Sequence, residues 1–275
     1  MESSICYLNG NYQALADTRV SVLDRGFIFG DAIYEVVPVF NGKPFRLPHH
    51  LDRLRASLAA ALMDDPLSRS EWIELSDRLV AENGAGDQTL YIQVTRGVAP
   101  RDHVLASPVA QTVFAMSSPL QVPRDVSPID AVTVEDQRWQ RCDIKTTSLL
   151  PNVIARAQAA QRGAQEAILI RDGYVTEGAA SNIFVVSGGR IKTPPLSPLI
   201  LPGITRDLLV ELDPRVAEEP VSVQELRNAD EVWVTSSGRE LVPVTRLDGD
   251  VVGNGTVGPV FLDTRAKYQA YKATR

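Results

Sequence analysis

An apolar stripe with helical spacing marks residues 48–62. Its members recur every three or four positions and so share one face of a helix: Leu51, Leu54, Leu58 and Leu62. A second helix is predicted over residues 71–82, because Ser68 and Glu71 form a capping-box pattern at its start. The first third of the chain therefore predicts two helices.

Alternation between apolar and polar positions predicts strands elsewhere. The segment TLYIQVTRG, residues 89–97, places aliphatic side chains at every second position, which is typical of a strand with one buried face. Tight hairpin turns are expected at Asn9–Gly10 and Asn41–Gly42, since Asn-Gly tolerates positive φ at both central positions.

Strands dominate the second half of the chain, with helices expected over residues 151–163, 205–212 and 260–272. This mixture disfavours a regular parallel α/β sheet and favours an α+β or barrel-like domain. A proline-containing stretch without helical period separates the two halves. The sequence therefore predicts three parts: an N-terminal domain (residues 1–118), a linker (119–128) and a C-terminal domain (129–275).

Composition narrows the function classes. The 275 residues carry a formal net charge of -6, which argues against a nucleic-acid partner. The two cysteines, Cys6 and Cys142, lack metal-ligand spacing, and no metal site is expected. No stretch is apolar enough for a membrane span, and the N-terminus lacks the features of a signal peptide. A cytoplasmic protein without a membrane partner is the expectation.

Several segments carry groups that bind anions in other proteins. Backbone amides at the predicted helix start near Ile204 and Thr205 would point outward, where a helix N-terminus attracts phosphate. Ser236 and Ser237 follow a predicted strand, and Arg53 lies on the first helix. Each signal is weak alone, because turns and solvated helix faces have the same composition.

Five motifs, in this order along the chain, resemble the fold-type IV pyridoxal-phosphate enzymes: FGDAIYEV, VTRGVAPRDH, RCDIKTTSLLPN, VTEGAASNIF and LPGITRD. Within that family the chain is most similar to the D-amino-acid aminotransferases. The resemblance implies a two-domain α+β protein with a small N-terminal α/β domain and a C-terminal pseudo-barrel domain. It also implies a homodimer that binds pyridoxal 5'-phosphate in the cleft between domains.

The resemblance also assigns roles to individual residues. It makes Lys145 the catalytic lysine that forms a Schiff base with the cofactor and shuttles the Cα proton. It makes Glu177 the carboxylate paired with the pyridine nitrogen. The remaining cofactor contacts that it implies are phosphate binding by Arg53, Ile204, Thr205, Ser236 and Ser237, packing of Leu201 on the ring, and an approach of Arg138 to the ring hydroxyl.

Substrate binding is expected to involve a carboxylate trap. Arg101 and His103 lie two residues apart and would point to the same side of an extended segment. The resemblance implies that this pair, from the neighbouring subunit, joins Tyr34 to bind the substrate carboxylate. The trap favours transamination between D-amino acids such as D-alanine and 2-oxo acids such as 2-oxoglutarate. The alternatives are an (R)-amine or branched-chain L-amino-acid aminotransferase, or an aminodeoxychorismate lyase.

Overall fold

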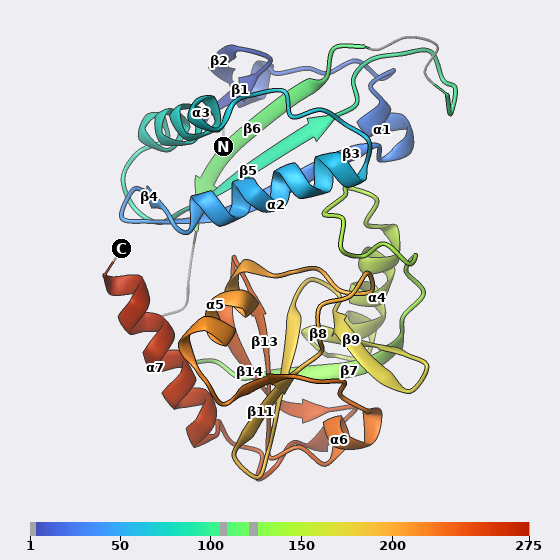
Figure 1. The fold of residues 1–275 in the computed structure, drawn as a ribbon, viewed down its shortest axis with the longest axis vertical. Helices are drawn as coiled ribbons and strands as arrows, with labels where there is room; N and C mark the ends of the chain where they lie inside the picture. Colours follow the sequence, from blue (N-terminus) through green and yellow to red (C-terminus); the bar gives the residue numbers. More distant parts are fainter. Residues whose placement is uncertain (1–3, 105–108, 121–125, 275) are drawn as a thin grey trace. The chain divides into compact units, whose positions relative to one another are not determined.

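The chain divides into two units, each with its own β-sheet (Figure 1). The computed structural model describes residues 4–104, 109–120 and 126–274. Unit 1 holds residues 1–121 together with Ile144–Ser148, and unit 2 holds Val122–Asp143 and Leu149–Arg275.

Unit 1 is an antiparallel six-stranded sheet in the order β2-β1-β6-β5-β3-β4. Its elements are β1 (Ile5–Leu8), β2 (Asn11–Ala14), the 3-10 helix η1 (Leu15–Asp17), α1 (Arg25–Phe29), β3 (Ala32–Phe40), β4 (Lys43–Pro44), α2 (Leu47–Ala60), α3 (Arg69–Glu82), β5 (Gln88–Thr95) and β6 (Thr112–Pro119). The two long helices match the predicted ones within a few residues, and the capping box of Ser68 and Glu71 is present.

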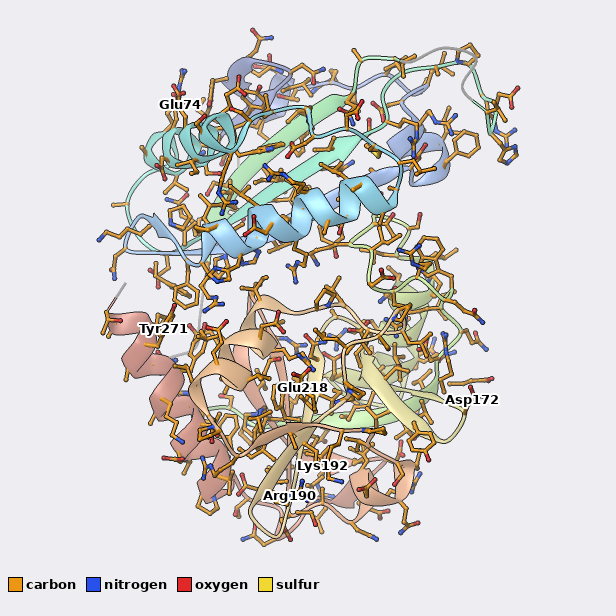
Figure 2. All side chains as sticks on the ribbon, in the orientation of Figure 1. Glu74, Asp172, Arg190, Lys192, Glu218 and Tyr271 are labelled. Carbon is orange, nitrogen blue, oxygen red and sulfur yellow. The ribbon has the colours of Figure 1, made fainter. Side chains whose placement is uncertain are left out.

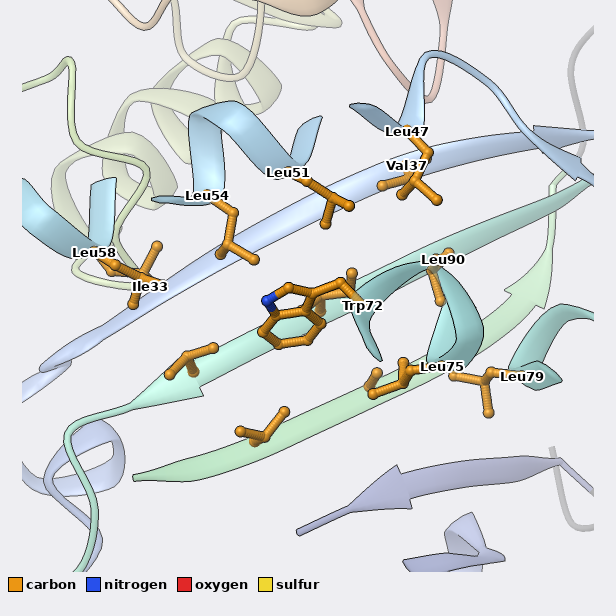
Figure 3. Packing of buried hydrophobic residues seen from close by; sticks show 14 of the residues in the cluster. Ile33, Val37, Leu47, Leu51, Leu54, Leu58, Trp72, Leu75, Leu79 and Leu90 are labelled. Carbon is orange, nitrogen blue, oxygen red and sulfur yellow. The ribbon is translucent and has the colours of Figure 1, made fainter. Parts of the chain in front are cut away.

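The core of unit 1 lies between the sheet and these two helices (Figure 3). The predicted stripe of α2 supplies Leu51, Leu54 and Leu58, all buried, whereas Leu62 lies beyond the helix and is exposed. Trp72 of α3 is 1% exposed in the same cluster. One continuous apolar layer thus fixes α2 and α3 on a common face of the sheet.

Unit 2 is built around a nine-stranded mixed sheet, with the main order β12-β11-β10-β13-β14-β7-β8-β9 and β15 paired to β14. Its elements are β7 (Ile129–Glu135), α4 (Leu150–Gln161), β8 (Glu166–Arg171), β9 (Tyr174–Gly178), β10 (Asn182–Ser187), β11 (Arg190–Thr193), α5 (Ile204–Leu212), β12 (Val216–Glu218), α6 (Val223–Arg227), β13 (Glu231–Ser236), β14 (Glu240–Leu247), β15 (Asp250–Val251) and α7 (Pro259–Ala273). Although β9 ends the sheet order, it also contacts β10, so the sheet curls back on itself.

The boundary between the units differs from a simple cut in the sequence. The prediction placed residues 144–148 in the C-terminal domain, but they pack with unit 1. At the linker, Pro119 belongs to β6 and the amide of Leu120 donates to the carbonyl of Asp87, while residues 121–125 lie outside the described part of the chain.

Candidate active site

Lys145 is held by backbone pairing with the first residues of β3. The amide of Tyr34 donates to the carbonyl of Lys145 at 2.9 Å, and the amide of Thr147 donates to the carbonyl of Ala32 at 3.0 Å. The amide of Lys145 donates to Ser57 Oγ of α2 at 3.1 Å. The segment Ile144–Ser148 is therefore hydrogen-bonded to both a strand and a helix of unit 1.

The side chain of Lys145 lies against Tyr34. Its Nζ is 4.2 Å from the centroid of the Tyr34 ring, a cation–π distance when the amine is charged. On the sheet the Tyr34 ring neighbours that of Tyr91, with centroids 5.7 Å apart. Burial raises the pKa of Tyr91 to about 12, so this neighbour stays neutral. The structure thus brings together the predicted catalytic lysine and the predicted substrate tyrosine.

Arg53 is buried and paired with a carboxylate that the sequence reasoning missed. Glu35 of β3 is fully buried and accepts from Arg53 Nε at 2.7 Å and Nη2 at 2.9 Å. His50 Nδ1 lies 2.7 Å from the same carboxylate. Burial opposes ionisation of Glu35, but the Arg53 charge and the hydrogen bonds outweigh it and hold the pKa of Glu35 well below its usual range. Arg53 is therefore a fixed guanidinium rather than part of a solvated helix face.

Arg101 and His103 converge on one aromatic ring. The Arg101 guanidinium carbon lies 5.4 Å from the centroid of Phe29, and the His103 ring centroid lies 5.5 Å from it. Both predicted substrate residues are exposed. Within the described residues, no hydrogen bond or ring contact links the pair to Tyr34 or Lys145 of the same chain.

In unit 2, Glu177 sits at the centre of a buried hydrogen-bond cluster. Its Oε2 accepts from the Leu201 amide at 3.0 Å and from Asn182 Nδ2 at 3.3 Å, and its Oε1 accepts from Arg138 Nη1. Burial raises the pKa of Glu177 to about 7, against the lowering effect of Arg138 and the Leu201 amide. A cationic N–H partner would stabilise the ionised form of this buried carboxylate.

Arg138 is oriented by a second carboxylate. Asp136 accepts from Arg138 Nε and Nη2, both at 2.9 Å, and Arg138 Nη2 also donates to the Leu199 carbonyl at 3.1 Å. The predicted approach of Arg138 to a ring hydroxyl is not tested by these contacts. The contacts with Asp136 and Leu199 orient the guanidinium so that Arg138 Nη1 donates to Glu177.

Four of the five predicted phosphate-binding residues belong to unit 2, namely Ile204, Thr205, Ser236 and Ser237, whereas Arg53 belongs to unit 1. Helix α5 begins at Ile204, and no side chain from the described residues caps that end. A Cβ on Gly203 would lie 1.9 Å from Oδ1 of Asn182, so a larger residue there would displace the Asn182 side chain. Asn182 pairs across the sheet with Thr235, whose buried hydroxyl lacks a hydrogen-bond partner among the described residues.

The two predicted serines continue from Thr235. Ser236 ends β13 and accepts from the Arg239 amide at 3.3 Å, and Ser237 lies in the following turn. An uncapped helix N-terminus, an unsatisfied buried hydroxyl and a serine turn fit a phosphate group. Together with the buried Glu177 carboxylate, they fit the phosphate and the ring nitrogen of pyridoxal phosphate.

Sequence reasoning missed four polar residues that hold the site: Glu35, His50, Asp136 and Asn182. Two left a signal in the sequence. Glu35 interrupts an otherwise apolar strand, and a charged residue at a buried strand position needs a partner. His50 lies three residues before Arg53, on the same side of a helix. Asp136 and Asn182 left none, because their partners depend on strand pairing.

Comparison with known proteins agrees with this arrangement. The family model for amino-transferase class IV matches residues 32–247. The chain therefore belongs to the class IV aminotransferase family. It is 40% identical to the D-alanine aminotransferase of Bacillus licheniformis, over 95% of this chain and 94% of that protein. It is 41% identical to that of Staphylococcus aureus strain MSSA476, over 96% of each chain.

Solved structures place the fold in the same family. The Escherichia coli branched-chain amino acid aminotransferase superposes with a TM-score of 0.91 at 26% identity, covering 98% of this chain and 94% of that one. The predicted two-domain α+β fold, the aminotransferase activity and the pyridoxal phosphate cofactor are confirmed by this membership. Among the described residues, no helix is long and apolar enough to cross a membrane.

Proposed function

We propose that the enzyme exchanges amino groups between D-amino acids, such as D-alanine, and 2-oxo acids, such as 2-oxoglutarate. The support is the 40% identity to D-alanine aminotransferases over nearly the full length, against 26% to a branched-chain enzyme. The observation that carries it is Lys145 beside Tyr34 in unit 1. The branched-chain aminotransferases of Escherichia coli and Thermoproteus uzoniensis share this fold but are each only 26% identical to the chain.

The predicted site residues would bind the phosphate and the ring of the cofactor. Arg53, Ser236, Ser237 and the amides of Ile204 and Thr205 would hold the cofactor phosphate, and Leu201 would pack on the ring. Bound pyridoxal phosphate supplies an aldehyde that bonds to amines and a protonated ring that withdraws electrons from the substrate Cα.

Lys145 would transfer the Cα proton of the substrate. Its Nζ would bind the cofactor covalently at rest and, once freed by substrate, take the proton from Cα and deliver it to the acceptor carbon. The carboxylate of Glu177 would accept the ring N–H, and Arg138 and the Leu201 amide favour its ionised form. The predicted contact of Arg138 with the ring hydroxyl stays a prediction.

The substrate carboxylate would bind Arg101 and His103 of one copy and Tyr34 of the other. Guanidinium and imidazole N–H donors suit a carboxylate, and its position relative to Lys145 would select the D configuration. A homodimer is therefore part of the proposal. Exposed apolar side chains on adjoining segments support it: Val20, Val22, Leu23, Phe27 and Val98.

The visible spectrum of the purified enzyme tests the chemistry. A yellow band should bleach with D-alanine and return with 2-oxoglutarate; bleaching by L-leucine or an (R)-amine but not by D-alanine would reject the substrate class. Borohydride reduction should attach the cofactor to Lys145. Lys145→Ala should fold without the band, while Lys192→Ala, at a lysine paired with Glu225 on unit 2 (Figure 2), should keep it.

Mixing an inactive variant with a variant of weakened substrate binding tests the shared site. A hybrid dimer of Lys145→Ala and Arg101→Met chains has one site with an intact lysine and, if the loop acts across the dimer, an intact arginine. Activity at low D-alanine concentration should therefore rise above that of either variant alone on mixing under subunit exchange. No such rise in verified hybrids would mean that Arg101 acts within its own chain. The cytoplasmic location also stays a prediction, supported by the two free, buried cysteines.

A further inference from the structure

The loop with Arg101 and His103 is tied to helix α1 by one arginine. Arg25 is 6% exposed, and its Nη1 donates to the Asp102 carbonyl while its Nη2 donates to the His103 carbonyl at 3.3 Å. Hydrogen bonds to consecutive carbonyls define the direction of the backbone between them. Arg25 thus fixes the peptide that joins the two predicted carboxylate ligands.

Arg25 is itself held rigidly. Its Nε pairs with Asp31 at 2.9 Å, and Asp31 is bound by Arg96 at 2.8 and 3.0 Å. Arg96 also donates to the carbonyls of Ala61 and Leu62, directly after α2. The loop is therefore connected, through two arginines and one aspartate, to the end of a core helix of unit 1.

Phe29 provides a second restraint on the same loop. The Arg25 guanidinium carbon lies 4.8 Å from its ring centroid, and Arg101 and His103 lie 5.4 and 5.5 Å from it. An aromatic face attracts guanidinium groups and limits their rotamers. The ring therefore holds both exposed side chains of the loop near one point.

We propose that Arg25 and Phe29 are positioning residues for the carboxylate-binding pair, so that they determine how tightly the enzyme holds an amino-acid carboxylate. The inference rests on the proposed function of Arg101 and His103. Both side chains are exposed, so without restraints they would lose freedom on binding each substrate. Ordering them beforehand strengthens binding without adding any new contact to the substrate.

Kinetics of the holoenzyme with D-alanine and 2-oxoglutarate test the proposal. Because small misplacements of binding groups cost on the order of 100-fold, Arg25→Met should raise KM for D-alanine roughly 10- to 100-fold, with a smaller effect on kcat. Phe29→Leu should act in the same direction. Arg78→Met, at an exposed arginine of α3, should leave both constants unchanged.

A double-mutant cycle separates positioning from general structural damage. If Arg25 acts through Arg101, then Arg25→Met should add little once Arg101→Met is present. Hydrogen exchange should be faster over residues 97–104 of Arg25→Met and unchanged in β13. Should Arg25→Met fail to fold, Phe29→Leu decides, because it leaves the Arg25–Asp31 pair intact.

The outcomes are distinct. KM changes below about twofold in a folded variant, or effects of Arg25→Met and Arg101→Met that multiply, would overturn the positioning role while the proposed function stands. A wild-type enzyme that does not convert D-alanine would overturn both.

Discussion

Removal of the Glu35 carboxylate should destabilise unit 1 more than any surface change. Glu35 is 0% exposed, and Glu35→Ala would remove the carboxylate that pairs with both Arg53 and His50 in the core. Breaking a buried ion pair by removing one partner costs about 3–5 kcal/mol. At about 1.4 kcal/mol per factor of ten, opening of unit 1 should become roughly 100- to 4,000-fold more frequent.

Hydrogen exchange measures this effect within one unit, which a whole-chain melting curve would not. Amides of β5 should exchange faster in Glu35→Ala, and amides of β13 should not. Glu35→Gln keeps one acceptor and should fall between wild type and Glu35→Ala. The matched control is Glu74→Ala, on the exposed face of α3 (Figure 2). A change in β5 below about tenfold, or one equal to the control, would refute the reasoning.

Acid should remove the same contribution. The pKa of Glu35 is lowered on folding from its ordinary value of 4.5, because Arg53 and His50 outweigh burial. A carboxylate with a lowered pKa stabilises the fold above that ordinary value and loses this effect as pH falls. The stability gap between wild type and Glu35→Gln should therefore narrow below pH 4.5. A gap that stays constant down to acid unfolding would contradict the pairing.

Further predictions concern unit 2. Asn182→Ala removes a donor to Glu177 and to the Leu201 carbonyl, so it should destabilise unit 2 by about 1–3 kcal/mol in urea unfolding and weaken cofactor retention on dialysis. Gly203→Ala should raise the Kd for pyridoxal phosphate, because its Cβ meets Asn182; Gly238→Ala, with no atom nearby, should not. Glu177, whose pKa is raised to about 7, disfavours folding of the cofactor-free enzyme as pH rises toward 7, so Glu177→Gln should gain stability relative to wild type over that range. A gain that is independent of pH would contradict the raised pKa.

Local patterns predicted the elements of the fold because their causes are local. The leucine stripe of α2 and the capping box of α3 each depend on residues within one helix, and both are present, except that Leu62 lies beyond α2 and is exposed. The domain division could not be read in the same way. Residues 144–148 leave their sequence neighbours to pair with β3, and this pairing depends on a strand more than 100 residues earlier in the chain.

The polar residues of α2 can be recognised in the sequence, but their partners cannot. On α2, His50, Arg53 and Ser57 form a polar stripe beside the leucine stripe, at spacing that places them on one side of the helix. The sequence contains this stripe but not its partners. Which acid faces Arg53 depends on the register between α2 and β3, and which amide meets Ser57 depends on the path of residues 144–148.

These non-local contacts give Lys145 a defined setting within unit 1. Its carbonyl accepts from Tyr34 and its amide donates to Ser57, so its backbone cannot move without disturbing both a strand and α2. Because Glu35 follows Tyr34 on β3, the same strand fixes the predicted substrate tyrosine on one face and the acid that orients Arg53 on the other. Alternation along β3 therefore sets the positions of the lysine, the tyrosine and the buried arginine together, although only one of these three residues contacts Glu35 directly.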